Sequence, residues 1–502
     1  MSDSGLYLGI DVGSTMVKAA LFDEAGSEQG IGRGAVRLST PAPGHVERSV
    51  DEVWAAVVSA VRGALSAPAA SDRGVRAVSI TGTGNGLILL DRRGAALTPH
   101  IMSSDTRTAD LLDRWRAAGL EPEIWRNTWQ VPWPGQPVAL LAWLKENSPG
   151  LLREAASLSV CKDYVRFRLC GALAGEITEL SSSALVFERD ARVVERHLDV
   201  LGVPWVADLI PPVRISPAEI AGEVTPTAAE ETGLAAGTPV VAGASDILAA
   251  ILGSGIASPG EVHLVAGTWG INQHLITGPA RTDGSVFATT LSHDPDLLLE
   301  LDGSPSSAGN LSWFMRTLAA DVAGDRSAYD VCDEEARAAA LDFEGPYFVP
   351  HLFGAFGNGH ARGAFIGIGA WHQRGEMVRA MYDGIASEHR WHVERLLGSS
   401  PRPARMRLAG GATRSELWTR MFAETMGAEI EVPRGSEAGA LGVAVLAQAA
   451  SEHVGIPEAV ARMTAVDRRV VPDPSAVREA ARRYEAYLIV REATTSLRLA
   501  AR

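Results

Sequence analysis

The chain has 502 residues and a formal net charge of −14, because 60 acidic residues outnumber 46 Lys and Arg residues. Hydrophobic residues make up 46% of the chain and charged residues 21%, which is typical of a globular protein and excludes a chain that is disordered throughout. The sequence has no basic cluster of the kind that binds nucleic acid and no apolar run long enough to span a bilayer, so we expect neither kind of partner.

The length and the cysteines limit the architecture further. A chain of this size is expected to form two sizeable domains. Its three cysteines, Cys161, Cys170 and Cys332, are too few and too scattered for a disulfide framework, and they form no CxxC metal pair. The first residues, MSDSGLYLGIDVGST, show no secretory signal. We therefore expect a cytoplasmic protein in a reducing compartment.

The first predicted element is a strand, tight turn and strand over residues 6–22. Asp11 ends the buried first strand, a Gly-Ser-Thr turn follows at residues 13–15, and Lys18 lies in the second strand. The backbone N–H groups of such a turn can surround an anion, and the nearby carboxylate can hold Mg²⁺ through its waters. An ordinary hairpin whose Asp bonds to the turn backbone explains the same residues equally well. Neither a P-loop nor a dinucleotide-binding fingerprint is present.

Alternating strands and helices follow, for example the strand-like residues 75–91 and the helix-like residues 106–119, which indicates the α/β class. Asp246 comes directly after the buried strand TPVVAGA and before a helix-like run. A carboxylate there could accept the proton of an attacking hydroxyl, or it could cap the helix. We place the domain boundary in the segment GSGIASPG, which predicts domains at 1–252 and 253–502.

A second hairpin is predicted over residues 261–275, with Gly267, Thr268 and Trp269 in its turn. Its plan is similar to that of the first hairpin, so the two indicate an internal duplication. Two anion-binding turns facing each other suit a nucleoside triphosphate.

The last chemical signal is the sequence MRLAGGATRSELWTRMF, in which a strand ends at Gly410-Gly411-Ala412 and a helix follows. Glycines leave room for a flat ring to approach the backbone, although a tight strand-to-helix turn also explains them. Large apolar residues of the following helix recur at helical spacing and are predicted to form core. They are Trp418, Met421, Phe422 and Met426. The final stretch, residues 475–502, is predicted to be a packing helix.

Taken in order, the motifs DxGST, GxxD, GTW and GGATRS closely resemble the FGGY carbohydrate kinases, which have the actin and hexokinase (ribonuclease H-like) fold. The resemblance extends from about Leu6 to about Ala450. It implies two domains, each a mixed sheet flanked by helices, with a cleft between them. It also implies ATP and Mg²⁺ as cofactors, Asp11 beside the metal and the γ-phosphate, and Asp246 as the general base. The implied ATP-binding residues are Asp11, Gly13, Ser14, Thr15, Lys18, Gly267, Thr268, Gly309, Asn310, Gly410, Gly411 and Ala412.

Within that family, passages such as TGTGNGLILLD, SSDTRTA and GSPSSAGNLSWF look most like L-xylulose kinases. That likeness implies transfer of the γ-phosphoryl group of ATP to a terminal hydroxyl of a ketopentose such as L-xylulose. The implied substrate contacts are Thr83, Asn85, Gly86, Asp105, Arg107, Asp246 and Trp269. Asp105 and Arg107 can also be read as a structural pair. L-xylulose kinases tend to carry a longer polar side chain where Thr83 stands, so erythritol or another polyol remains an alternative substrate.

An ATP-driven conformational switch, the other use of this fold, is the alternative outside enzymes. The carboxylate of Asp246 together with the polar residues around Asn85 favours the kinase, because a binding module needs only the nucleotide site. The expected partners are ATP and a small sugar or polyol, with no nucleic acid and no membrane; a homodimer is left open.

Overall fold

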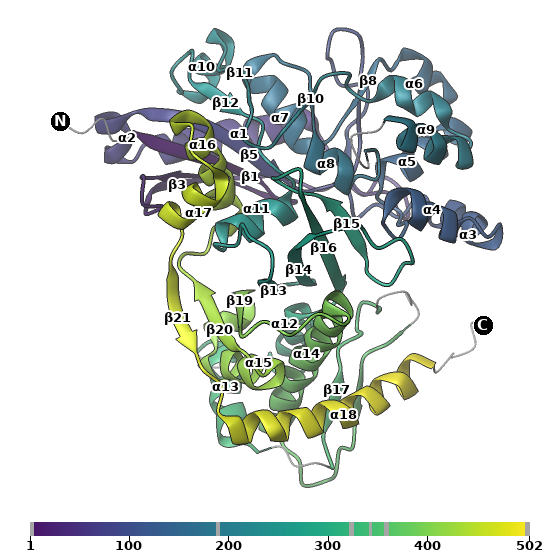
Figure 1. The fold of residues 1–502 in the computed structure, drawn as a ribbon, viewed down its shortest axis with the longest axis vertical. Helices are drawn as coiled ribbons and strands as arrows, with labels where there is room; N and C mark the ends of the chain where they lie inside the picture. The colour runs from purple at the N-terminus through teal and green to yellow at the C-terminus, as the bar shows by residue number, and fades with distance from the viewer. Residues whose placement is uncertain (1–4, 187–190, 321–325, 341–343, 356–360, 497–502) are drawn as a thin grey trace. The chain divides into compact units, whose positions relative to one another are not determined.

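The computed structural model (Figure 1) describes residues 5–186, 191–320, 326–340, 344–355 and 361–496. Its contacts divide the chain into two compact units. The first unit consists of Met1–Pro259, Leu275–Leu299 and Glu437–Ala465, and the second of Gly260–His274, Glu300–Ser436 and Val466–Arg502. The chain first leaves the first unit at residue 259, at the end of the predicted boundary segment. Two later segments, Leu275–Leu299 and Glu437–Ala465, belong to the first unit again. A single domain boundary in the sequence, as predicted, therefore does not separate the two units.

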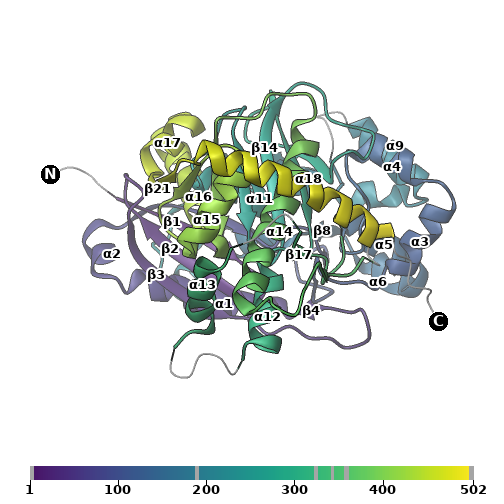
Figure 2. The ribbon, with the colours of Figure 1, turned by 90° about the horizontal axis from the view of Figure 1, so that it is seen from below.

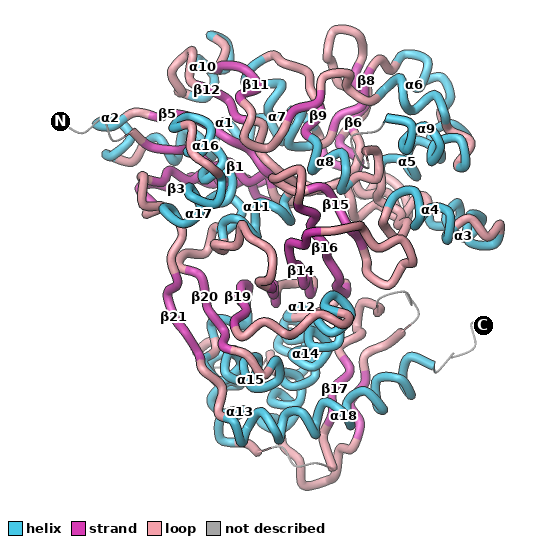
Figure 3. The backbone as a smooth tube through the Cα atoms, in the orientation of Figure 1, coloured by secondary structure: helices cyan, strands magenta, loops and turns pink. Residues whose placement is uncertain are grey.

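A six-stranded mixed sheet forms the centre of the first unit, with the order β11-β12-β5-β1-β2-β3 (Figure 3, magenta). Parallel pairing joins β1, β5 and β12, whereas β2, β3 and β11 pair antiparallel with their neighbours. The strands are β1 (Leu6–Val12), β2 (Met16–Phe22), β3 (Glu28–Ala35), β5 (Val75–Gly82), β11 (Ile220–Glu223) and β12 (Pro239–Val241). Three two-stranded sheets pair β4 (Glu47–Arg48) with β7 (His100–Ile101), β6 (Ile88–Leu90) with β8 (Ser157–Ser159), and β9 (Gly175–Glu176) with β10 (Arg214–Ile215).

Helices cover both faces of this sheet. The helices of the first unit are α1 (Val50–Leu65), α2 (Pro68–Arg73), α3 (Ala109–Ala117), α4 (Glu121–Thr128), α5 (Pro137–Asn147), α6 (Pro149–Glu154), α7 (Cys161–Cys170), α8 (Ile177–Ser182), α9 (Ala191–Val200), α10 (Pro226–Thr232), α11 (Asp246–Gly253), α16 (Ala438–Glu452) and α17 (Ile456–Met463), with a 3₁₀ turn, η1, at Pro204–Leu209. The first strands and helices thus follow the predicted order, including a helix within the predicted range 106–119.

Side-chain alternation along β1 decides which of its residues can reach the site. Successive side chains of a strand point to opposite faces. Leu6, Leu8, Ile10 and Val12 pack in the core that contains α1, whereas Tyr7 packs in the core that contains α16 and α11. Asp11 has the same parity as Tyr7 and therefore lies on the face covered by α16.

The approach of α16 to β1 is unusually close. A Cβ atom at Gly9 would lie 1.9 Å from the carbonyl oxygen of Ala440, and one at Gly439 would lie 2.8 Å from the Asp11 carboxylate. Real Cβ atoms essentially never lie so close to a backbone oxygen, so position 9 requires glycine, whereas a side chain at position 439 would force the Asp11 carboxylate to move. The pair of glycines brings the first turn of α16 directly against the end of β1.

The second unit is built on a sheet of seven strands in the order β15-β16-β14-β13-β19-β20-β21. Its outermost strand, β15, and the far ends of β14 and β16 are counted with the first unit. The strands are β13 (Val262–Ala266), β14 (Gly270–Thr277), β15 (Ala288–Leu291), β16 (Leu297–Ser304), β19 (Arg405–Gly410), β20 (Glu429–Pro433) and β21 (Val466–Val470), with a separate pair of β17 (Tyr347–Val349) and β18 (Ala364–Ile366). The helices are α12 (Ala308–Leu318), α13 (Ala328–Ala338), α14 (Arg374–Leu397), α15 (Glu416–Met426) and α18 (Pro474–Ser496), with the 3₁₀ turn η2 at Gly411–Arg414.

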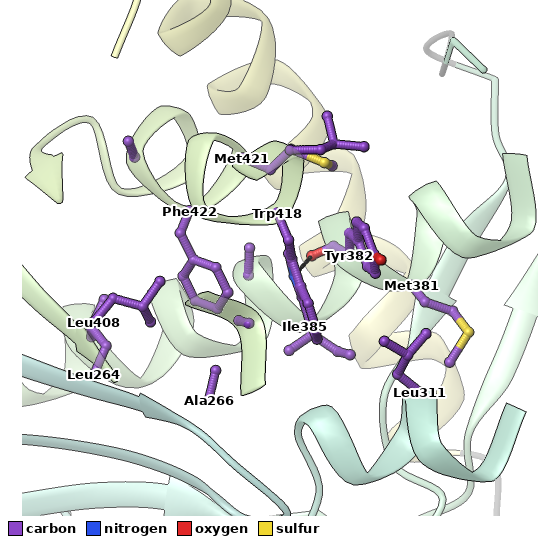
Figure 4. Close-up of a cluster of buried hydrophobic side chains, with 14 of the residues drawn as sticks. Leu264, Ala266, Leu311, Met381, Tyr382, Ile385, Leu408, Trp418, Met421 and Phe422 are labelled. Carbon is purple, nitrogen blue, oxygen red and sulfur yellow. Dashed lines mark hydrogen bonds between the residues drawn. The ribbon is translucent and has the colours of Figure 1, made fainter. Parts of the chain in front are cut away.

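The core of the second unit confirms the predicted apolar face of α15. Trp418, Phe422 and Met426 are buried against β13, β19 and α14, and Met421 belongs to the same cluster (Figure 4). The indole N–H of Trp418 donates to the carbonyl oxygen of Tyr382 at 3.1 Å, and the two rings stack with centroids 4.4 Å apart. Burial of large side chains contributes about 2 to 3 kcal/mol each, so this cluster is a major source of stability in the unit.

The predicted packing helix near the end of the chain is confirmed as far as Ser496, and the rest of the predicted range, residues 497–502, lies outside the described residues. In Figure 2, α18 (yellow) lies across α14. Tyr487 donates to Glu388 at 2.6 Å, and Arg483 donates to Asp383 at 2.9 Å. No helix within the described ranges is both long and apolar enough to cross a membrane.

Candidate active site

The first predicted phosphate-binding turn is the turn between β1 and β2, and Arg48 holds it from behind. The Nη1 of Arg48 donates to the carbonyl oxygens of Gly13 at 2.6 Å and Ser14 at 3.0 Å. In a trans peptide the C=O and the N–H point in opposite directions. The N–H groups of Ser14 and Thr15 therefore point away from Arg48, and both residues are exposed. A turn with outward-pointing N–H groups has the geometry of an anion-binding site.

Arg48 is itself locked in place. It is only 1% exposed, its Nε donates to His100 Nδ1 at 3.0 Å, and its Nη2 contacts the sulfur of Cys161 at 3.0 Å. Burial and the Arg48 charge hold the pKa of His100 well below its usual range, so the imidazole is neutral and can accept that hydrogen bond. Sequence reasoning missed Arg48, because nothing in the local pattern of the 2-residue strand β4 indicates a contact with a turn 34 residues earlier.

Asp11 and Lys18 face each other in the register of the β1–β2 hairpin. Burial is the largest cause that raises the pKa of Asp11 to about 6, and the charges of Asp246 and Glu437 raise it further while Lys18 lowers it. The Nζ of Lys18 pairs with Glu437 at 2.8 Å. The ammonium group predicted to assist phosphate is thus engaged with a carboxylate from the residue that precedes α16.

Asp11 fits a Mg²⁺ ion whose other ligands are waters and phosphate oxygens. No group of three or more Asp, Glu, His or Cys side chains in the described residues could form a protein cage for a metal. Burial, and after it the negative charges of Asp246 and Glu437, raise the pKa of Asp11, and a nearby cation would favour its ionised form. Mg²⁺ is commonly bound by one or two carboxylates together with waters and phosphate oxygens, and this arrangement matches that mode.

Asp246 is the first residue of α11, and Ser245 occupies the N-cap position. Its Oδ1 accepts the N–H of Ile247 at 2.8 Å, and its Oδ2 accepts the N–H of Gly84 at 3.3 Å. Burial raises the pKa of Asp246, while these N–H groups oppose the rise. The carboxylate therefore binds its own helix terminus and also reaches the loop after β5. The N-cap residue is therefore Ser245 and not Asp246, although the Asp246 carboxylate accepts one N–H of the first helical turn, and the role of Asp246 as general base stays a prediction.

The loop at residues 83–86, which follows β5, carries three of the predicted substrate contacts. Thr83 donates from its hydroxyl to the carbonyl of Val12 at 3.2 Å, which ties this loop to the end of β1. Asn85 adopts a left-handed backbone with φ 60°, and Gly86 follows with φ 72°. A left-handed non-glycine residue is strained, and such strain concentrates at functional sites.

Two buried polar side-chain atoms at this loop have no hydrogen-bond partner among the described residues. They are the Oδ1 of Asn85 and the Oε2 of Glu179. Glu179 contacts the loop directly, since its Oε1 accepts the N–H of Asn85 at 3.0 Å. Buried polar atoms are normally paired, so a group of unpaired ones beside Asp246 indicates a polar ligand. Sequence reasoning missed both His100 and Glu179.

Asp105 and Arg107 form a network that favours the structural reading. Arg107 donates to both oxygens of Asp105, at 2.9 and 2.8 Å, and also to Glu47 at 2.6 Å. Asp105 accepts the N–H of Val46 at 2.7 Å and is 1% exposed. With its oxygens thus occupied, Asp105 ties the segment around β4 to the segment after β7. Direct substrate contact by the pair stays a prediction.

The remaining predicted residues lie in the second unit, where they gather around the β13–β14 turn. A Cβ atom at Gly309 would lie 3.1 Å from the carbonyl oxygen of Thr268, and one at Gly410 would lie 3.0 Å from the N–H nitrogen of Gly267. The start of α12 and the end of β19 therefore both abut this turn. Trp269 is 50% exposed in the same turn.

Two of the residues predicted to bind the nucleotide have buried side chains. Asn310 is fully buried, and its amide donates to Ser306 at 2.7 Å and to the carbonyl of Ser307 at 2.8 Å, so it supports the loop before α12. The side chain of Ala412 is fully buried in the core of the second unit.

Gly411 instead lines a cavity of about 330 Å³ in this unit. The other lining residues are Ala308, Leu311, Ser312, Ser327, Tyr329, Asp330, Asp333, Tyr382, Arg414, Ser415 and Trp418. Small and aromatic residues next to hydroxyl and carboxylate groups suit a flat heterocycle with polar edges. Of the residues predicted to border the adenine ring at the end of β19, Gly411 lines this cavity and Gly410 and Ala412 do not, and contact with the ring stays a prediction.

The chain is similar in sequence to known carbohydrate kinases. A model described as FGGY family of carbohydrate kinases, N-terminal domain, matches residues 6–253, and the corresponding C-terminal domain matches residues 262–451. A probable L-xylulose kinase of Pasteurella multocida is 32% identical over 497 residues, which covers 98% of this chain and 99% of that protein. The L-xylulose/3-keto-L-gulonate kinase of Escherichia coli is 29% identical over 482 residues, covering 96% and 95%.

Two solved structures have a similar fold. Ligand-bound xylulose kinase from Lactobacillus acidophilus superposes with a TM-score of 0.90 at 21% identity, covering 98% of this chain and 99% of that chain. Glycerol kinase from Plasmodium falciparum with ADP gives a TM-score of 0.86 at 18% identity, covering 99% of both chains. These likenesses confirm the predicted α/β fold with two domains.

Proposed function

Because the chain belongs to the FGGY family of carbohydrate kinases, we propose that it phosphorylates a terminal hydroxyl of a small ketose, with L-xylulose as the first candidate. The family itself makes the protein a phosphotransferase with an alcohol group as acceptor. The names of the two relatives support the choice of sugar. The observation that carries the proposal is a pair of buried polar atoms, Asn85 Oδ1 and Glu179 Oε2, that have no hydrogen-bond partner in the described part of the chain and lie at the loop that also bonds Asp246. A polyhydroxylated substrate supplies the hydrogen bonds that these atoms lack.

In the proposed reaction, Asp246 accepts the proton of the terminal hydroxyl as its oxygen attacks the γ-phosphorus of ATP. A new P–O bond to the sugar forms, and the bond from the γ-phosphorus to the ADP oxygen breaks. The N–H groups of Ser14 and Thr15, together with those of the β13–β14 turn, are proposed to bind the phosphates. Because this reaction needs little covalent help from the protein, positioning and electrostatic stabilisation supply most of the rate.

The cavity beside Gly411 is proposed to bind the adenine ring, and Asp11 to hold Mg²⁺ through waters and phosphate oxygens. When bound, the ion would neutralise charge that develops on the phosphates. The role of this chain's residues is to hold the ionised carboxylate of Asp11 at the end of β1.

A panel of sugars and polyols, assayed by ADP release and by mass spectrometry of the product, tests the proposal. We expect L-xylulose to give the highest kcat/KM and a product heavier by one phosphoryl group. A higher kcat/KM for erythritol would replace the ketose by a polyol. Slow ATP hydrolysis that no sugar stimulates would contradict the kinase and favour a conformational switch.

Arg48→Lys is expected to raise the KM for ATP about tenfold. Lysine keeps the charge but cannot donate at once to the two turn carbonyls, His100 and Cys161, so the outward N–H groups lose their fixed orientation. The measurement is the steady-state KM for ATP at saturating sugar.

Arg62→Lys is the matched control, because Arg62 also donates to a backbone carbonyl, that of Glu231 at 2.7 Å, but on the exposed side of α1. We expect it to leave the KM for ATP within twofold. A KM for ATP that is equally unaffected in Arg48→Lys would show that the turn needs no support from Arg48.

A further inference from the structure

Glu179 has no assigned role, yet it is placed as a residue of the substrate site would be. It lies on α8, is 1% exposed, and contacts the loop at residues 83–86 through its Oε1, which accepts the N–H of Asn85 at 3.0 Å. Its Oε2 is buried without a hydrogen-bond partner among the described residues. Burying a carboxyl oxygen without a hydrogen-bond partner costs free energy, so we expect this oxygen to bind a ligand.

The Glu179 and Asp246 carboxyl groups converge on one point. A Cβ atom at Gly84 would lie 3.1 Å from Asp246 Oδ1 and 3.5 Å from Glu179 Oε1. The same two carboxyl groups accept the consecutive N–H groups of Gly84 and Asn85. The bare Cα of Gly84 thus leaves room where the two acids come together.

The charges behind α8 are satisfied without Glu179. Lys162 pairs with Asp163 at 2.8 Å and with Glu176 at 3.2 Å, and Glu176 accepts the N–H groups of Thr178 and Glu179 at the start of α8. These contacts satisfy the ammonium group of Lys162 and the first N–H groups of α8 within the protein. Glu176 therefore has a structural role that is complete within the protein, whereas Glu179 does not.

The surroundings of Glu179 favour its protonated form. Burial raises its pKa well above the usual range, and the charges of Asp246 and Asp163 raise it while Lys162 lowers it. A protonated carboxyl group has an O–H donor in addition to its acceptor oxygen.

We propose that Glu179 is a second substrate-contacting residue, whose Oε2 hydrogen-bonds an oxygen atom of the same sugar that Asp246 deprotonates. The proposal rests on the proposed kinase function and extends it. Glu179 binds and orients the sugar, whereas Asp246 takes part in the chemical step. The alternative is that Glu179 only holds Asn85 in its left-handed conformation.

Glu179→Ala and Glu179→Gln separate these possibilities. We expect Glu179→Ala to raise the KM for the sugar at least tenfold and leave the KM for ATP within twofold, since a lost hydrogen bond to a substrate appears in the binding of that substrate. Glutamine retains both an acceptor for Asn85 and a donor for the sugar, so Glu179→Gln should recover most of the loss. Equal losses in both variants would contradict a hydrogen bond from residue 179 to a sugar oxygen and would overturn the proposal.

Deoxy analogues of the best sugar provide the decisive measurement. If Oε2 binds one sugar oxygen, the analogue without that oxygen should bind wild type about tenfold more weakly, and Glu179→Ala should not distinguish it from the parent sugar. If Glu179→Ala weakens the parent sugar and every analogue by the same factor, Glu179 acts only through the loop and the proposal fails.

Glu176→Gln is the matched control on the same helix. It should lower the melting temperature and leave the KM for the sugar within threefold, because Glu176 contacts α8 and Lys162. A rise in this KM equal to that of Glu179→Ala would show that disturbing α8 is sufficient, which also overturns the proposal. Wild type is assayed first. Absence of sugar-dependent ADP release there refutes the kinase function itself, an outcome distinct from any difference between variants.

Discussion

Asp246→Ala is expected to lower kcat by about a thousandfold or more while the protein stays folded and still binds ATP. The expected size is that of a general base, whose removal typically costs 10² to 10⁴ in rate. The carboxylate accepts the N–H of Ile247 in its own helix and the N–H of Gly84, and the core of the first unit does not include it, so we expect the fold to survive its loss. Turnover is measured by sugar-dependent ADP release, and folding by thermal melting.

Asp246→Asn provides the companion measurement. Asparagine can still accept the N–H of Ile247 but cannot take a proton, so it keeps the helix terminus and loses the base. Both variants should therefore lose turnover to a similar extent. Turnover within tenfold of wild type in either variant would contradict the assignment of Asp246 as the base.

Asp11→Asn is expected to lower activity about a hundredfold at limiting Mg²⁺ and to raise the Mg²⁺ concentration needed for half-maximal rate. Loss of a group that orients a metal typically costs 10- to 100-fold in metal affinity or activity. The measurement is a Mg²⁺ titration at fixed ATP for wild type and variant. An unchanged titration would remove Asp11 from the metal site.

The pKa of Asp11 gives this prediction a pH dependence. With a pKa of about 6, the carboxyl group is ionised above that pH and protonated below it. Mg²⁺ must then compete with a proton, so the Mg²⁺ requirement of wild type should rise as the pH falls below about 6. The requirement of Asp11→Asn should not change over this range.

At pH 7.5, Asp11→Asn should raise the stability of the protein although it lowers the activity. A carboxyl group whose pKa is raised in the folded state contributes stability below its unfolded pKa of 3.8, and this contribution is lost as the pH rises through about 6. At pH 7.5 the charge of Asp11 therefore costs stability, and Asp11→Asn should melt at a higher temperature than wild type. The difference should vanish near pH 3.8. A lower melting temperature at pH 7.5 would contradict this account of the burial of Asp11.

Local sequence patterns predicted those parts of the structure that local interactions determine. The two hairpins, the strand before Asp246 and the apolar face with Trp418 and Phe422 follow from alternation and helical spacing, which neighbouring residues set. The family was predicted because its four motifs occur in a fixed order along the chain, even though each motif is weak alone.

Contacts between residues that are far apart in the sequence could not be predicted in this way. Arg48 reaches the first turn from a short strand, and Glu179 reaches Asn85 across 94 positions in the sequence. No periodicity or turn signal records such pairings. The same holds for Lys18, whose pairing with Glu437 joins residues more than four hundred positions apart, and for Asp105, which accepts the N–H of Val46, 59 positions earlier.

The close packing of α16 on β1 has a consequence for how the protein is made. The face of the first sheet that carries Gly9 and Asp11 is covered by residues near Ala440, so a nascent chain cannot complete this unit until most of its length has left the ribosome. Until then the apolar side of the strand is bare and available for aggregation. Synthesis that halts between the two units should therefore yield a chaperone-dependent fragment, however native its first strands become.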